Sequence, residues 1–325
     1  MLCAALFMGA ACLFSQPAMA GSCCGGGGGS TLVLPKFYQA MVDVSFDLEK
    51  YDGFWNAKNE YTHDSPGTHL LQERLNFGYA QRISNRWQTS VSIPYVWNNN
   101  KYNTGNSKKE GPGDSTVSVW YEAVEDLSAW KIRSLKDWTP SIKIGPSLLI
   151  PTGISPYDGV GHDEDITGRG FYRLDGNLIV GKTLHPWSAT WALGYGSYLG
   201  RPVNEEPGGV SGKYVSPYRL KPGNRFSTSL ALSYIYYLGS SGDTLTGTAA
   251  ISDLEEAGTL RTDENGTQHV PGMQKRAVAG TLAYSSTDHD WSVRVSWSHA
   301  VRENGWGKNF PSTDIYTTGV SYAFR

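Results

Sequence analysis

Apolar and polar residues alternate one by one along much of the chain, most clearly near its end. Between positions 316 and 324, one set of alternate residues is largely aromatic or apolar and the other is small or polar: Tyr316, Thr318, Val320, Tyr322 and Phe324 against Thr317, Gly319, Ser321 and Ala323. Because successive side chains of a strand point to opposite faces, this segment is predicted to be a strand with one apolar and one wet face.

The same alternation predicts strands through the rest of the chain, without a convincing helix. The number of predicted strands is even, so the start of the first strand and the end of the last lie on the same side of the membrane. The weakest is 243–252, because its Thr-Gly-Thr-Ala-Ala run carries little apolar mass. The twelve predicted strands are 38–51, 69–81, 87–97, 114–124, 139–151, 171–184, 189–199, 224–238, 243–252, 274–286, 290–301 and 313–324.

Each strand offers an apolar face that can point to lipid. In the first strand this face holds Val42, Val44, Phe46 and Leu48, and in a later one it holds Phe226, Leu230, Leu232, Tyr234 and Tyr236. No uncharged apolar stretch of helix-spanning length follows the first residues, so a closed barrel is the structure left for crossing a membrane. The predicted fold is an all-β, transmembrane, antiparallel up-and-down β-barrel of about twelve strands.

The links between strands alternate in length, as they do in outer-membrane barrels. Turns at 82–86, 185–188, 239–242 and 287–289 are short, whereas the links at 52–68, 98–113, 152–170, 200–223, 253–273 and 302–312 are long and polar. The link at 125–138 is an exception, with a helical turn expected around 127–130. Aromatic residues at strand ends are expected to form an interfacial girdle: Trp87, Trp97, Trp138, Trp187, Tyr198 and Trp291.

A secreted soluble β-sandwich or propeller would also show alternating strands. It would explain neither the asymmetry of the links nor the aromatic residues at the end of the chain. That last segment resembles the closing strand of bacterial outer-membrane barrels, from which Arg325 after Phe324 departs by one residue. We therefore expect the outer membrane of a Gram-negative bacterium, with membrane lipid and lipopolysaccharide around the protein.

The first residues carry targeting signals. The apolar run Leu2 to Phe14 and the small residues around Ala20 predict a signal peptide over 1–20, which is removed. Residues 21–36 form a Cys/Gly-rich tether, and 37–325 form the barrel. The tether holds Cys23 and Cys24, for which lipid attachment, a vicinal redox pair and no function at all stay open. The Gly run that follows is a flexible linker.

Composition changes this picture little. Hydrophobic residues make up 39% of the chain and aromatic residues 12%, yet the mean hydropathy is −0.37, as expected when lipid-facing positions are diluted by a polar lumen. The net charge of −2 gives no reason to expect a nucleic-acid partner.

Two short motifs carry a more specific resemblance. Gly111-Pro112-Gly113-Asp114 opens one strand, and a later strand runs into Ile150-Pro151-Thr152-Gly153. Together with Ser-Ile-Pro-Tyr at 92–95, they resemble the phenol meta-pathway type outer-membrane transporter family, which is distantly like the long-chain fatty-acid transporter barrels. The resemblance implies a channel for hydrophobic or aromatic compounds, with Gly111, Gly113, Asp114, Pro151, Thr152 and Gly153 as the family motif. Residues 21–36 are too few for the plug of the fatty-acid transporters.

Charged residues of both signs fall on the predicted lumenal faces. Opposed charges in a pore narrow it and create a transverse field, although each could instead pair across the lumen and hold the barrel's shape. Twelve strands lie between a filled barrel of eight and an open porin of sixteen, so a narrow passage is expected. The candidate constriction residues are Asp43, Asp47, Glu49, Arg74, Lys143, Arg173, Asp175, Arg225 and Arg294.

The sequence offers no catalytic, metal or cofactor signature. Seven His residues show no metal-binding spacing, no G-x-S-x-G is present, and His299 at a strand end is an isolated candidate. The acidic cluster from Asp158 to Asp165 is read as a solvated loop rather than a Ca²⁺ site. Two functions stand: passive uptake of small hydrophobic or aromatic solutes, or a structural or surface barrel acting through its loops or a periplasmic partner.

Overall fold

The computed structural model describes residues 32–35, 38–103, 105–126, 130–206, 214–239, 242–286 and 290–325. The predicted signal peptide and most of the predicted tether, including Cys23 and Cys24, lie outside these residues. Among the described residues, no helix has the length and the hydropathy needed to cross a membrane.

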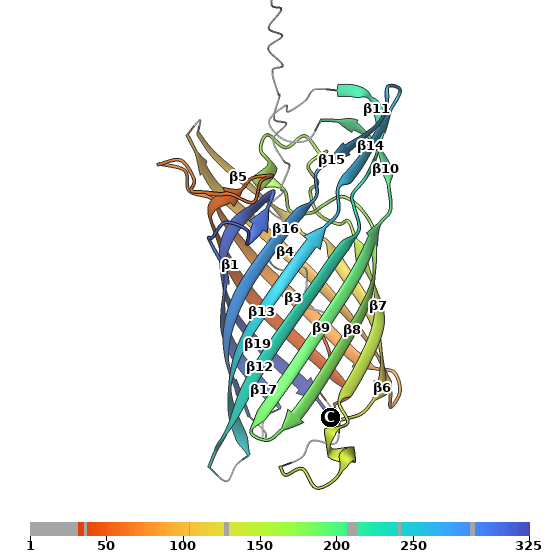
Figure 1. The fold of residues 1–325 in the computed structure, drawn as a ribbon, viewed down its shortest axis with the longest axis vertical. Helices are drawn as coiled ribbons and strands as arrows, with labels where there is room; N and C mark the ends of the chain where they lie inside the picture. The colour runs from red at the N-terminus through yellow and green to blue at the C-terminus, as the bar shows by residue number, and fades with distance from the viewer. Residues whose placement is uncertain are drawn as a thin grey trace, which may run out of the picture.

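A closed barrel of twelve antiparallel strands makes up most of the described chain (Figure 1). Each strand pairs with its neighbours in sequence, and the first pairs with the last, so the prediction of an up-and-down β-barrel is confirmed. The strand expected at 243–252 is present and extends further, to Glu256. The barrel strands are β1 Ala40–Trp55, β3 Leu71–Arg82, β4 Trp87–Tyr102, β6 Ser115–Val124, β7 Ser141–Ile150, β8 Arg173–Leu184, β9 Trp187–Tyr198, β12 Arg225–Leu238, β13 Asp243–Glu256, β16 Met273–Ser285, β17 Trp291–Ala300 and β19 Phe310–Phe324.

The seam between β1 and β19 closes the sheet. It runs in continuous register from Ala40 opposite Phe324 to Tyr51 opposite Thr313, and resumes after a bulge at Phe54. Closure removes the unpaired edges that an open sheet would expose, and in lipid every backbone polar group must find a partner of this kind.

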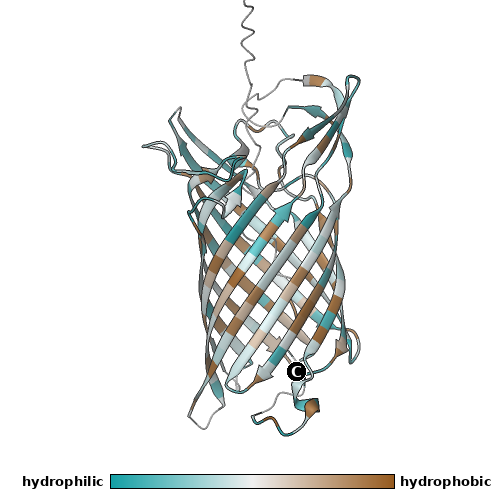
Figure 2. Ribbon diagram, in the orientation of Figure 1, coloured by the Kyte–Doolittle hydropathy of each residue, from teal (hydrophilic) through white to brown (hydrophobic). Residues whose placement is uncertain are grey.

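The two faces of the wall follow the alternation in the sequence. On β1, Asp43, Ser45 and Asp47 are buried inside the barrel, whereas Val44 is 41% and Phe46 37% exposed on the outside. Apolar residues recur on the strands of the barrel, whereas the loops above them are largely hydrophilic (Figure 2). Such an outward apolar face is what a bilayer's hydrocarbon requires.

Tyr198 corrects one part of the predicted girdle. It is only 1% exposed and lies inside the barrel, whereas Trp87 and Trp187 are exposed on the outside as expected. Trp191 and Tyr195 also point outward from β9, and Tyr198 stands three positions after Tyr195. An odd separation along a strand reverses the face.

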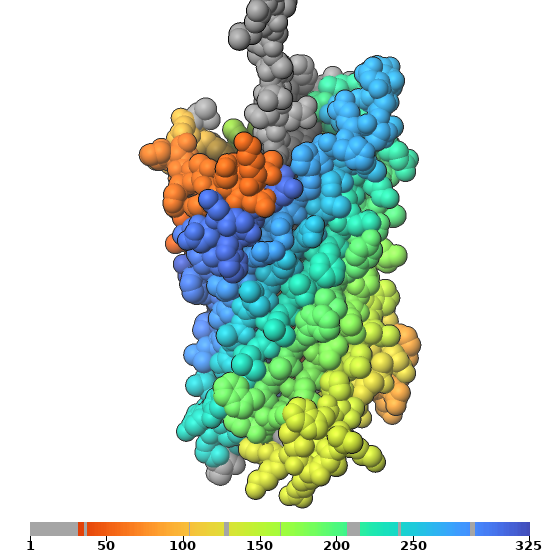
Figure 3. Space-filling model, viewed as in Figure 1, coloured from red at the N-terminus to blue at the C-terminus, as the bar shows by residue number. Residues whose placement is uncertain are grey.

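Short links join the strands at one end of the barrel, here called the turn end, and long links join them at the other, called the loop end. The long exception at the turn end contains a 3₁₀ helix, η2 at Leu135–Trp138. Residues 127–129, on which the expected helical turn falls, lie outside the described chain. Figure 3 shows this link projecting below an otherwise continuous wall.

The loops at the opposite end form structure of their own. A four-stranded sheet joins two of them, with the order β10 Arg201–Glu205, β11 Tyr214–Lys221, β14 Thr259–Asp263 and β15 Gly266–Val270 (Figure 1). The remaining pieces are β2 Tyr61–Thr62, β5 Gly105–Pro112, β18 Gly307–Lys308 and the 3₁₀ turn η3 Asp163–Asp165. A small apolar core joins residues of this sheet to residues at the loop end of the barrel: Leu149, Phe171, Tyr198, Val203, Tyr218 and Leu220.

Candidate lumenal site

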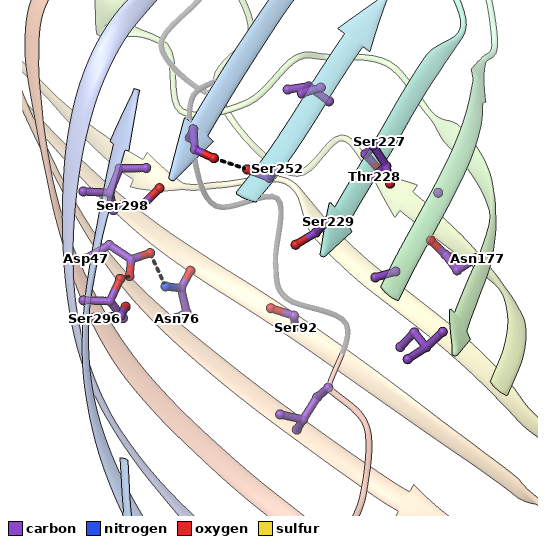
Figure 4. A pocket seen from close by; sticks show the side chains of 18 of the residues that line it. Asp47, Asn76, Ser92, Asn177, Ser227, Thr228, Ser229, Ser252, Ser296 and Ser298 are labelled. Carbon is purple, nitrogen blue, oxygen red and sulfur yellow. Dashed lines mark hydrogen bonds between the residues drawn. The ribbon is translucent and has the colours of Figure 1, made fainter. Parts of the chain in front are cut away.

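A cavity of about 540 Å³ lies inside the barrel, with side chains from strands around the wall projecting into it (Figure 4). Small hydroxyl and amide groups dominate one part of the lining, including Asn76, Ser92, Asn177, Ser227, Ser229, Ser252, Ser296 and Ser298. Apolar side chains of Leu32, Ile179, Ala192, Leu254 and Ile315 make up another part. The lining of the cavity is therefore partly polar and partly apolar.

Three predicted charges, Asp47, Glu49 and Arg74, meet on the inner wall formed by β1 and β3. The register sets Asp47 opposite Arg74, and the guanidinium lies 3.5 Å from Asp47 and 3.2 Å from Glu49. Asn76 and Thr317 donate further hydrogen bonds to Asp47 at 2.8 and 2.7 Å. All three charged side chains are buried, so the network braces the wall on the inside of the barrel.

Asp43 and Arg294 form a second pair across an intervening strand. The Arg294 guanidinium donates two hydrogen bonds to the Asp43 carboxylate, at 2.5 and 2.9 Å. β19 lies between their strands, and its Gly319 makes room, because a Cβ there would stand 2.8 Å from the guanidinium carbon. A two-bond Arg–carboxylate pair is the strong form of this interaction.

A third group of charges lies at the loop end of β8, β9 and β13. Arg173 donates to Asp175 at 2.6 Å and to the Tyr198 hydroxyl at 3.0 Å. That hydroxyl in turn donates to Glu256 at 3.2 Å, and Arg169 from the loop above forms an ion pair with the same carboxylate. The group therefore joins the 152–170 link to the barrel wall.

Sequence reasoning missed three members of this group: Arg169, Tyr198 and Glu256. Glu256 could have been found by continuing the period of β13 beyond 252, since Ser252 and Leu254 already line the cavity. Arg169 carries no such signal, because a loop residue has no periodic face.

Arg225 and Lys143 belong to none of the three groups. Arg225 lines the cavity beside the third group, and Lys143 lies half-buried on the inner face of β7. Neither side chain has a hydrogen-bond or ion-pair partner within the described residues. A role in solute passage for all nine predicted constriction residues stays a prediction.

The motif residues come together in a latch at the loop end. The Asp114 carboxylate accepts hydrogen bonds from the backbone N–H of Gly153 at 3.1 Å and of Arg169 at 2.6 Å. Thr152 donates its hydroxyl proton to the Gly113 carbonyl at 2.5 Å and accepts from the N–H of Ser115 at 3.1 Å. Burial raises the pKa of the Asp114 carboxyl, while the two backbone donors oppose that shift.

The motif glycines permit the close packing of this latch. A Cβ at Gly113 would lie 2.8 Å from Pro94, and one at Gly153 would lie 2.6 Å from the backbone of Gly168. At Gly111, Ile154 would be 3.1 Å away. Gly111, Gly113 and Gly153 thus let the 152–170 link press against the strand ends, with Pro151 at the point where the link leaves β7.

The latched link folds inward over the cavity. Asn98 donates to the carbonyl of Ile166 at 2.9 Å, and Asn100 donates to the Asp165 carboxylate at 2.9 Å. Asp165 is 1% exposed, which corrects the expectation of a solvated acidic loop at this position. Its partners are amide and hydroxyl donors on β4 and β5. Within the described chain, no three His, Cys, Asp or Glu residues group closely enough to hold a metal ion.

At the turn end, residues 32–35 lie inside the barrel. Leu34 is buried against Met41, Ala80 and Ala323, and its N–H donates to Gln88 at 2.8 Å. Leu32 lines the cavity. The described part of the predicted tether therefore narrows the lumen at the turn end, while the latched link covers the lumen at the loop end.

His299 lies on the outer face near the loop end. Its Nδ1 is 2.8 Å from Asp314, which also accepts from Trp297 at 3.0 Å and pairs with Arg302. The described partners of His299 include no Ser or Cys nucleophile, so this cluster ties strand ends together.

No protein-family model and no curated protein matches the sequence. Solved structures match in fold. An outer membrane channel from Pseudomonas putida F1 has a TM-score of 0.62 at 13% identity, covering 91% of this chain and 98% of that chain. The β domain of a Bordetella autotransporter gives 0.48 at 11% identity over 88% of this chain and 100% of that chain. The Pseudomonas putida toluene transporter TodX gives 0.39 at 9% identity over 88% and 89%.

At these identities the likeness establishes the fold. A closed twelve-strand barrel with an outward apolar face belongs to the β-barrels of the Gram-negative outer membrane. The finer resemblance to the phenol meta-pathway type family rests on the motif residues alone.

Proposed function

We propose that the protein is a passive outer-membrane channel for small hydrophobic or aromatic solutes. The observation that carries the proposal is the lumenal cavity of about 540 Å³, whose lining combines apolar side chains with small hydroxyl groups. Such a mixture suits solutes that are mostly apolar and carry few polar atoms. The likeness in fold to a channel at 13% identity is consistent with this function but identifies no solute.

The covered ends of the cavity favour small solutes over large ones. The 152–170 link lies over one end and Leu32 to Pro35 over the other, so a wide water-filled pore is absent from the described structure. Among the described residues, most lumenal charges are neutralised by partners on the wall, which leaves no ring of like charge there to select ions. Passive passage of this kind requires no chemical reaction by the protein.

Uptake into proteoliposomes tests the proposal. Ser229 projects into the cavity and Leu230, its neighbour, is exposed on the lipid face. We expect Ser229→Trp to fill the lumen and reduce the entry of toluene-sized aromatic solutes, whereas Leu230→Trp should leave entry unchanged. Equal entry for the wild type, for both variants and for protein-free liposomes would refute the channel function.

A structural or surface-interaction barrel is the second candidate. The four-stranded sheet of β10, β11, β14 and β15 favours it, because this sheet projects beyond the barrel and is built from loop residues (Figure 1). Deleting the β14–β15 hairpin separates the two functions. Surface binding should be lost if the loops carry the function, and solute entry should persist if the lumen does.

A further inference from the structure

We infer that Arg225 forms a subsite in the lumen for the single anionic group of an amphipathic solute, such as an aromatic carboxylate. The inference rests on the proposed function and narrows its substrate class. Arg225 begins β12 at the loop end and lines the cavity from the inner face.

The carboxylates nearest to Arg225 by register are already engaged. Glu256 stands directly opposite on β13, but it pairs with Arg169 and accepts from Tyr198. Asp175 stands at the same level two strands away, where Arg173 donates to it at 2.6 Å. Throughout the described residues, no hydrogen bond or ion pair reaches the Arg225 guanidinium.

The other arginine of the cavity differs in this respect. Arg294 is held by two hydrogen bonds to Asp43, at 2.5 and 2.9 Å. Arg225 therefore keeps the donors that a planar guanidinium offers to a carboxylate or sulfonate in a two-bond geometry. A cation withdrawn from bulk water without a fixed partner gains more from an arriving anion than one already paired.

Apolar side chains lie directly below this cation. Register places Leu254 opposite Ser227, one inward position beneath Arg225, and Ala192 opposite Ser229 one position further. Ile179 pairs with Ala192 at the same level. A solute with its anionic group at Arg225 would rest its apolar body on Leu254, Ala192 and Ile179, which is the reason for assigning an amphipathic rather than an inorganic anion.

Matched ligands and variants test the subsite. The probes are naphthalene-2-sulfonate, which is charged at all working pH values, and naphthalene-2-sulfonamide, its neutral counterpart at pH 7. Arg225→Gln removes the charge while keeping a similar length, and Arg225→Lys keeps the charge. Lys221→Gln is the control, because it removes one positive charge from an exposed position on β11.

Calorimetric titration of the folded barrel in neutral detergent gives the ratio of the two affinities. The wild type should favour the sulfonate about tenfold, as expected for one charge-assisted contact. Arg225→Gln should abolish this preference, Arg225→Lys should retain part of it, and Lys221→Gln should match the wild type. An unchanged ratio in Arg225→Gln, or an equal loss of both ligands, would overturn the subsite.

Uptake of the same pair into proteoliposomes separates this inference from the proposed function. Binding that depends on Arg225 without entry of either compound would keep the subsite and refute the channel. Entry of the sulfonamide without any preference for the sulfonate would keep the channel and refute the subsite.

Discussion

The latch around Asp114 can be broken with one substitution. Asp114→Ala removes the acceptor for two backbone N–H groups, those of Gly153 and Arg169. Each lost hydrogen bond costs about 1–2 kcal/mol. This is at the low end for a charged acceptor, because removal of the buried carboxylate also removes the free-energy cost of its desolvation. The 152–170 link should therefore detach about 2–4 kcal/mol more easily, while the barrel stays folded.

Hydrogen exchange measures this opening directly. A change of about 2–4 kcal/mol corresponds to roughly thirty- to seven-hundredfold faster exchange of the protected amides in the link. Single-channel recordings should show more frequent open events in the same variant, since the link covers the cavity. Heat-modifiable migration on a gel confirms that the barrel is intact.

A matched control for this experiment is Asp263→Ala. Asp263 also accepts a backbone N–H, that of Asn265 at 2.8 Å, but in an exposed turn where water replaces it. Its exchange pattern in the 152–170 link should equal that of the wild type. Unchanged exchange in Asp114→Ala would refute the latch and would mean that contacts such as Asn98 with Ile166 hold the link alone.

Three further predictions concern the wall and the lumen. Val44→Arg should destabilise the protein by about 2–4 kcal/mol in lipid near the bilayer midplane, whereas Ser45→Arg, which points into the lumen, should be tolerated; the reverse order in unfolding experiments would invert the faces of β1. Phe324→Ser should reduce the heat-modifiable folded fraction more than Arg325→Ser, since Phe324 is exposed to lipid and pairs at the seam, and equal folded fractions would contradict this. Arg294→Gln should free an acidic partner and make any conductance more cation-selective; the reversal potential in a salt gradient would stay fixed if the pair were only structural.

The wall of the barrel could be predicted because each strand faces lipid on one side and a polar lumen on the other. Apolar and polar side chains therefore alternate along the strands. The weak strand at 243–252 was predicted because the number of strands has to be even. Tyr198 shows where composition misleads, because aromatic character suggested an interface and only the period from Tyr195 reveals the inward face.

The loop end could not be predicted in the same way. β11 pairs with β14, a strand of another loop that is distant in sequence, and the local sequence pattern does not identify such a partner. The motif residues were found by resemblance, yet the latch also depends on two residues beyond both motifs. Arg169 donates its backbone N–H to Asp114, and Thr167 donates its hydroxyl proton to the Pro112 carbonyl. For the same reason, the sequence did not predict that Asp165 is buried or that Leu34 lies in the lumen.

The seam between β1 and β19 also bears on how the protein folds. Most neighbouring strands of the wall are consecutive in sequence and can form as local hairpins, whereas Ala40 can meet Phe324 only when nearly the entire chain has been gathered. Contacts of such high sequence separation slow folding because loop-closure entropy is lost before they form. Zipping of this seam is thus expected to be the rate-limiting step of assembly, and until it finishes the two strands remain open edges that can pair with the wrong chain.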